Sequence, residues 1–127
     1  MTHGARAWSA AAVLWALLIV VFGALPTQQL VSEVAPEREA ASTLLGHFVE
    51  YLVLAALLTA ALGRRYGVAR RAALVMVLAV GLGVAIEVAQ AFLPYRDCQL
   101  LDVLVNAGGA FCGLAVVSAI ERLRARG

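Results

Sequence analysis

Polar and ionisable residues interrupt otherwise apolar segments from position 47 onward, and these residue types could do chemistry. They are His47, Glu50, Tyr51, Glu87, Gln90, Asp102 and Asn106. Histidine changes its charge near neutral pH, so it can take up or release a proton. Carboxylates and amides beside it supply hydrogen-bond acceptors and donors. The set therefore favours either proton handling or the binding of a polar ligand.

The spacing of these residues indicates helices. Neighbours on a helix surface are three or four positions apart, so each set shares one helical face. The sets are His47 with Glu50 and Tyr51, Glu87 with Gln90, and Asp102 with Asn106. The last face continues into Gly109 and Gly113, and this GxxxG spacing permits close helix packing.

The segments that carry these residues are unusually apolar. Of the 127 residues, 63% are hydrophobic and 14% are charged, whereas about 25% of the residues in a soluble domain are charged. Four stretches are long enough to cross a bilayer as helices, and they are too long and too uniformly apolar for barrel strands. We therefore predict an all-α fold. It is a four-helix transmembrane bundle in one domain over residues 1–127, with spans at about 7–25, 44–62, 72–93 and 100–120.

The first stretch runs without a charge from Ala7 to Leu25 and is followed by Pro26. As a helix it would be about 28 Å long, which matches the hydrocarbon core of a bilayer. A cleaved signal peptide is the alternative, because the residues before it are few and basic. We favour a retained span, since the apolar run is long for a signal core and a good cleavage site is missing. The polar segment from Gln28 to Thr43 is expected to be an interfacial loop or a short amphipathic turn.

The arginines predict how the bundle is oriented. The amino terminus, the segment from Gly63 to Arg71 and the carboxyl terminus carry most of them, and four spans place these three regions on one side. Arginine-rich loops stay in the cytoplasm, so both termini are predicted to be cytoplasmic. His47, Glu87 and Asp102 then lie within about 10 Å of the outer ends of their spans. We expect the polar residues to meet in the outer third of the bundle.

The same motifs, in their order, resemble a known family. They are the run His47 to Tyr51, the ExxQ of Glu87 and Gln90, the P-x-R of Pro94 and Arg96, the DxxxN of Asp102 and Asn106, and the GxxxG of Gly109 and Gly113. Over about residues 44–115 the chain is similar to the VanZ-like membrane proteins. The resemblance implies a bacterial four-helix membrane protein, and one founding member is associated with low-level resistance to the glycopeptide teicoplanin. Leu44 and Leu45 stand where many relatives have a basic residue, and Cys98 stands where many have serine.

The polar residues also admit a structural interpretation, in which a buried hydrogen-bonded network fixes which helices touch. We favour a functional site because the polar groups are more numerous than packing requires. Arg96 is expected to pair with a carboxylate at the outer mouth, and the alternative is that it holds an anionic head group. The acids and the histidine are suitable metal ligands, but their spacing matches no established metal motif. We therefore predict no metal and no cofactor.

Two functions follow from these observations. The first is an auxiliary factor of the bacterial cytoplasmic membrane that affects envelope susceptibility to teicoplanin-type glycopeptides through the polar site. The second is an intramembrane enzyme or small transporter that uses the histidine and the acids for acid and base chemistry, so enzymatic activity stays undecided. The expected partners are membrane lipids and a lipid-linked envelope molecule or lipoglycopeptide. A homo-oligomer is an open alternative, and nucleic acid is not expected because the arginines form no continuous polar face.

Overall fold

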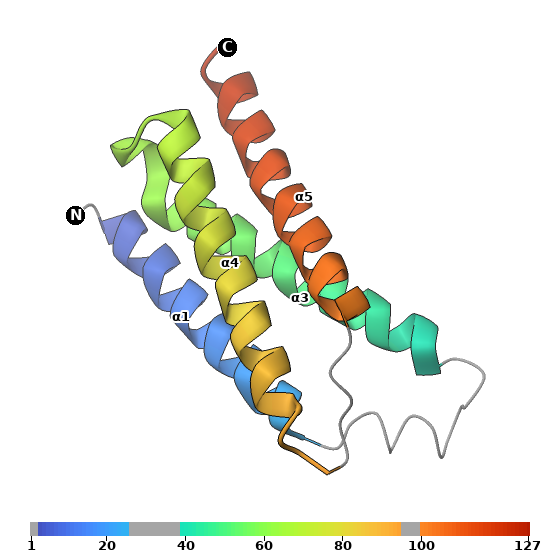
Figure 1. Ribbon diagram of the computed structural model, residues 1–127. Helices are drawn as coiled ribbons and strands as arrows, with labels where there is room; N and C mark the ends of the chain where they lie inside the picture. The colour runs from blue at the N-terminus through green and yellow to red at the C-terminus, as the bar shows by residue number, and fades with distance from the viewer. Residues whose placement is uncertain (1–2, 26–38, 95–99) are drawn as a thin grey trace.

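The computed structural model describes residues 3–25, 39–94 and 100–127, and almost all of them are helical (Figure 1). The long helices are α1 (His3–Ala24), α3 (Glu39–Leu62), α4 (Val68–Gln90) and α5 (Leu100–Arg124). A short 3-10 turn, η2 (Gly63–Arg65), follows α3. The described residues contain no strand. The predicted all-α four-helix fold is thereby confirmed.

All four long helices have the length and composition needed to cross a membrane. Their outer faces carry large apolar side chains, among them Val13, Val77 and Phe111, which are 61%, 70% and 63% exposed. Several polar side chains are buried instead, including Glu87 and Asp102. A protein in water rarely exposes so much contiguous apolar surface. Lipid is therefore the solvent that suits the outside of this bundle.

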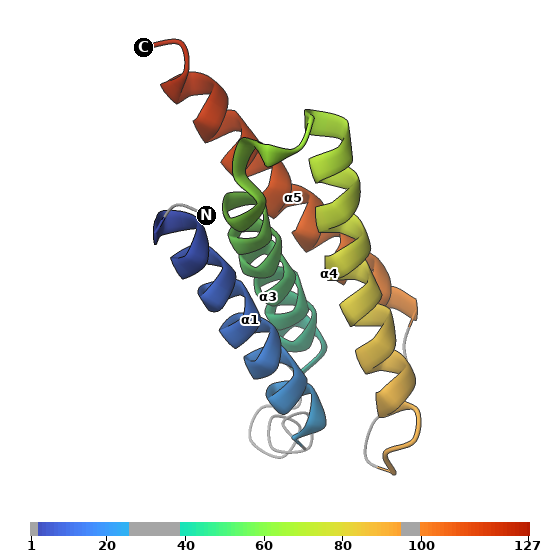
Figure 2. The same cartoon turned by 90° about the vertical axis from the view of Figure 1, so that its left-hand side faces the viewer.

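The helix α3 lies at the centre of the bundle, between α1 and α4, and it packs most closely against α5 (Figure 2). Two glycines of α5 permit this close approach. A Cβ atom at Gly109 would collide with the backbone carbonyl oxygen of Phe48, and one at Gly113 would collide with that of Leu52. The GxxxG face of α5 therefore lies directly on the backbone of α3, as small-residue motifs do in membrane helix pairs.

Side-chain hydrogen bonds from Trp15 and Gln90 attach α1 to its neighbouring helices. The indole Nε1 of Trp15 donates to the carbonyl oxygen of Glu50 on α3 at 2.9 Å. The amide Nε2 of Gln90 on α4 donates to the carbonyl oxygen of Gly23 at 2.9 Å. Both bonds satisfy polar groups that would otherwise face lipid.

The helix bounds differ from the approximate predicted spans by a few residues at most ends, and two of these differences concern helix ends beside the predicted site residues. The third predicted span was expected to continue to Leu93, but α4 ends at Gln90 and a tight turn follows, with Leu93 N donating to Gln90 O at 2.9 Å. Pro94 contributes to the early end, because its ring clashes with a helical carbonyl four residues earlier, at Gln90, and it has no backbone N–H to donate there.

The helix that contains the second predicted span also begins earlier in the chain than the span itself. The structure has helix from Glu39, so the last part of the predicted loop from Gln28 to Thr43 is helical. Its earlier part, up to residue 38, lies outside the described residues. Alanines at 40 and 41 favour helix, which lets α3 continue beyond its purely apolar stretch.

Both chain ends and the turn between α3 and α4 lie at the same end of the bundle (Figure 1). We call this the arginine end, since Arg64, Arg65, Arg70 and Arg71 are located there. An ion pair joins α4 and α5 at this end: Arg71 Nη1 lies 2.8 Å from Glu121 Oε2. Arg71 also donates to the carbonyl oxygen of Gly63 at 3.0 Å, which anchors the turn.

Candidate functional site

Three helices bring a histidine and two carboxylates together at the end of the bundle opposite the arginine end. His47 Nε2 of α3 lies 3.7 Å from Asp102 Oδ2 of α5. Ligating atoms of His47, Asp102 and Glu87 of α4 all lie within 4.8 Å of one another. Glu87 and Asp102 are only 2% and 3% exposed. We call these three residues the polar triad.

One helical turn deeper, the same three helices form a second polar layer. Tyr51 and Asn106, each four residues beyond a member of the polar triad, are 1% and 2% exposed. Gly83 stands between them on α4, where a Cβ atom would lie 3.1 Å from Asn106 Nδ2 and 3.3 Å from the Tyr51 hydroxyl oxygen. Asn106 Oδ1 has no hydrogen-bond partner among the described residues. This layer therefore keeps one buried acceptor available.

Below the second layer the core becomes apolar. Ala55, Ala79 and Ala110 are fully buried and belong to one hydrophobic core cluster with Val75 and Leu114. They continue the four-residue spacing of the polar layers along α3, α4 and α5. The interface of these helices is thus polar at the triad end and apolar below the second polar layer. These apolar side chains, which we call the apolar floor, lie below any polar group that enters the interface from the triad end.

The other predicted site residues lie around the polar triad and not within it. Gln90 was predicted to share the site, but its side-chain amide is directed to α1, where it donates to Gly23. Glu50 is half-buried on α3, and its backbone carbonyl accepts the hydrogen bond from Trp15. Arg96 lies outside the described residues. The group of residues that the structure brings together is therefore smaller than the set of site residues predicted from the sequence.

The polar triad has the components of acid and base chemistry. A carboxylate beside an imidazole can orient the ring and set which nitrogen carries the proton. The second carboxylate adds a proton acceptor or a hydrogen-bond acceptor for a ligand. One imidazole and two carboxylates within 4.8 Å also have the ligand types and separation that a divalent cation requires.

Two residues that support the site were not singled out from the sequence. Gly83 makes room for the second layer, and Trp15 fixes α1 to the backbone beside Tyr51. Gly83 precedes Glu87 by four residues, so its place on the same face could have been noticed. Nothing in the sequence pattern identified the acceptor of the Trp15 indole.

Comparison with known proteins agrees with the architecture. No curated protein and no solved structure matches the chain significantly. A family model described as VanZ/LLP1 matches residues 8–121, which include α3, α4, most of α1 and α5, and the polar triad. The chain is thus a multi-pass membrane protein, and it belongs to the VanZ/LLP1 family.

Proposed function

We propose that this protein is an auxiliary factor of the bacterial cytoplasmic membrane that lowers envelope susceptibility to teicoplanin-type glycopeptides. The observation that carries the proposal is the polar triad, in a chain of the VanZ/LLP1 family. Buried acids and a histidine within a membrane are expensive, and they usually mark a ligand or proton site. The site would engage a lipid-linked or lipophilic molecule from the outer leaflet.

The chemistry of the triad favours a ligand that is rich in hydrogen-bond donors. Glu87 and Asp102 present acceptors, and Asn106 Oδ1 adds another one turn deeper. A glycopeptide carries peptide N–H and sugar O–H groups, and an acyl chain would hold such a molecule at the membrane surface. The apolar floor formed by Ala55, Ala79 and Ala110 limits the site to the polar part of the ligand.

The proposal requires the polar triad to face the outside of the cell. The distribution of arginines supports this orientation, because the arginine end then lies in the cytoplasm. Fusions at the carboxyl terminus test it: a fluorescent protein should be bright and alkaline phosphatase inactive. An active phosphatase fusion would place the triad at the cytoplasmic surface and refute the proposal.

Drug susceptibility tests the proposed function directly. Cells that express His47→Ala, Glu87→Ala or Asp102→Ala at membrane levels equal to wild type should become as sensitive to teicoplanin as cells without the protein. Thr59→Val is the matched control, because Thr59 is a fully buried polar residue of α3 whose hydroxyl donates to the carbonyl oxygen of Ala55 in its own helix. Unchanged resistance in the three triad variants would overturn the proposal.

An intramembrane enzyme or small transporter is the second candidate, and the 3.7 Å approach of His47 to Asp102 favours it. Glu87→Gln separates the two candidates, because glutamine keeps the shape of the side chain but cannot exchange a proton. Loss of a turnover or a flux in this variant, with normal protein abundance, would favour the second candidate. Loss of drug protection without any measurable turnover would favour the first.

A further inference from the structure

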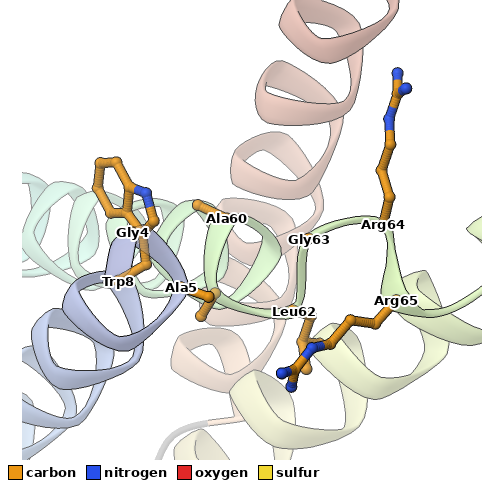
Figure 3. Close-up of a pocket in the computed structure, with 9 residues that line it drawn as sticks. Gly4, Ala5, Trp8, Ala60, Leu62, Gly63, Arg64 and Arg65 are labelled. Carbon is orange, nitrogen blue, oxygen red and sulfur yellow. The ribbon is translucent and has the colours of Figure 1, made fainter. Parts of the chain in front are cut away.

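Two adjoining cavities open beside α1 at the arginine end. The first, of about 530 Å³, lies between Trp8 of α1 and the turn that carries Arg64 and Arg65 (Figure 3). The second, of about 360 Å³, continues along the bundle between apolar side chains such as Val13, Leu58 and Leu78. Ala61, Leu62 and Arg65 line both cavities. Together they form a cleft with a polar head and an apolar tail.

The way α1 is attached explains why the cleft is open at this end. The hydrogen bonds of Trp15 and Gln90 hold the middle and the far end of α1. Towards the arginine end α1 presents the small residues Ser9, Ala12 and Ala16 to the cleft. The Ser9 hydroxyl donates to Ala5 of its own helix at 2.9 Å, so this wall offers little polarity to a ligand. The tail of the cleft is therefore suited to a hydrocarbon chain.

Arg65 is the cation available at the head of the cleft. Its neighbours are engaged: Arg64 donates to the Glu121 carbonyl oxygen at 3.5 Å, and Arg70 lies 5.2 Å from the centre of the Tyr66 ring. Arg65 makes no hydrogen bond or ion pair with any residue that the structure describes, and its side chain points to a different side of the turn from that of Arg64 (Figure 3). A guanidinium beside an apolar groove is complementary to a phosphate that carries an acyl chain.

We infer that this cleft binds one anionic phospholipid from the leaflet at the arginine end. The phosphate pairs with Arg65, and one acyl chain lies along Val13 and Leu58. Trp8 stands at the same end, where tryptophan commonly meets the head groups. The site lies at the opposite end of the bundle from the polar triad, so it does not depend on the proposed function.

Native mass spectrometry of the full-length protein in detergent tests the inference. Wild type titrated with phosphatidylglycerol should retain one tightly bound lipid, and phosphatidylcholine should bind more weakly. Arg65→Gln should weaken phosphatidylglycerol binding by about fivefold, the loss expected for one arginine near a lipid phosphate. Arg70→Gln removes the same charge from the start of α4, outside the cleft, and should leave binding within about twofold of wild type.

A matched pair of variants tests the part of the site that would hold the acyl chain. Val13 and Leu14 are both 61% exposed, but only Val13 lines the cleft. Val13→Phe should fill the tail and reduce lipid retention, whereas Leu14→Phe should not. Equal losses in Arg65→Gln and Arg70→Gln, or in Val13→Phe and Leu14→Phe, would mean unspecific lipid attraction and would overturn the inference. Equal retention of the two lipids by wild type would overturn it as well.

Discussion

His47 Nε2 of α3 lies 3.7 Å from Asp102 Oδ2 of α5, across the helix pair that packs most closely in the bundle. Two turns beyond Asp102, Gly109 brings the backbone of α5 into contact with that of α3 at Phe48, the residue after His47. The separation of the imidazole and the carboxylate is therefore controlled by small residues that carry no chemistry of their own.

Gly109→Ala should destabilise the bundle. The new methyl group would collide with the carbonyl oxygen of Phe48, and overpacking of this kind costs about 1–3 kcal/mol. Gly108→Ala is the neighbouring control, because its Cβ would have no atom nearer than 4.0 Å. Alanine is the better helix former there, so the control should keep or raise the melting temperature in detergent. A melting temperature in Gly109→Ala equal to that of the control would contradict the close contact.

Gly83→Ala should impair the site more than it impairs folding. Its methyl group would lie 3.1 Å from Asn106 Nδ2, so the amide must shift by a few tenths of an ångström. We expect reduced protection against teicoplanin at normal membrane abundance. The control is Gly81→Ala, on the exposed face of α4 with open space around it. If both variants protected cells equally well, the second polar layer would have no part in function.

Trp15→Phe should loosen α1. The substitution keeps an aromatic ring but removes the donor to the Glu50 carbonyl, and such interhelical bonds contribute about 0.6 kcal/mol on average in membrane proteins. The expected result is a small fall in melting temperature in detergent. Trp8→Phe serves as the control, since its ring is 49% exposed and lines the cleft at the arginine end. Equal stability of the two variants would argue against a stabilising hydrogen bond between Trp15 and the Glu50 carbonyl oxygen.

Arg71→Gln should destabilise the arginine end. Breaking a buried ion pair costs about 3–5 kcal/mol, and the loss should be smaller here because the Glu121 side chain is 26% exposed. Thermal unfolding in detergent measures the loss, and Arg70→Gln in the same turn should have little effect. A double variant, Arg71→Glu with Glu121→Arg, should recover part of the stability. No recovery would show that the Arg71 contact with Gly63 matters more than the pair.

The bundle itself could be predicted because a bilayer imposes simple local rules. Long segments that are mostly apolar form helices in a bilayer, and clusters of arginine mark the ends that stay on one side. Helical spacing and depth together also predicted that His47, Glu87 and Asp102 would lie near one another, and the structure places their side chains in one group. Each of these inferences needs only the rise and period of a helix.

What the sequence could not supply depends on helix tilt and on side-chain direction. Gln90 shares a face with Glu87, but the approach of α1 draws its amide to Gly23. Gly83 has no side chain that would identify it as a site residue, and its role follows only from the positions of Tyr51 and Asn106. The end of α4 at Gln90 was missed because the apolar pattern continues past the last helical residue. Tertiary contacts determine these features, and no local sequence pattern predicts them.

The central claim is that the polar triad acts as one site, and combined substitutions test it most directly. Teicoplanin susceptibility should be measured in cells with His47→Gln, with Asp102→Asn and with both changes, at matched membrane levels. If the residues form one site, each single variant should lose most of the protection and the double variant should lose no more. Independent, additive losses, or full protection in the double variant, would contradict the account.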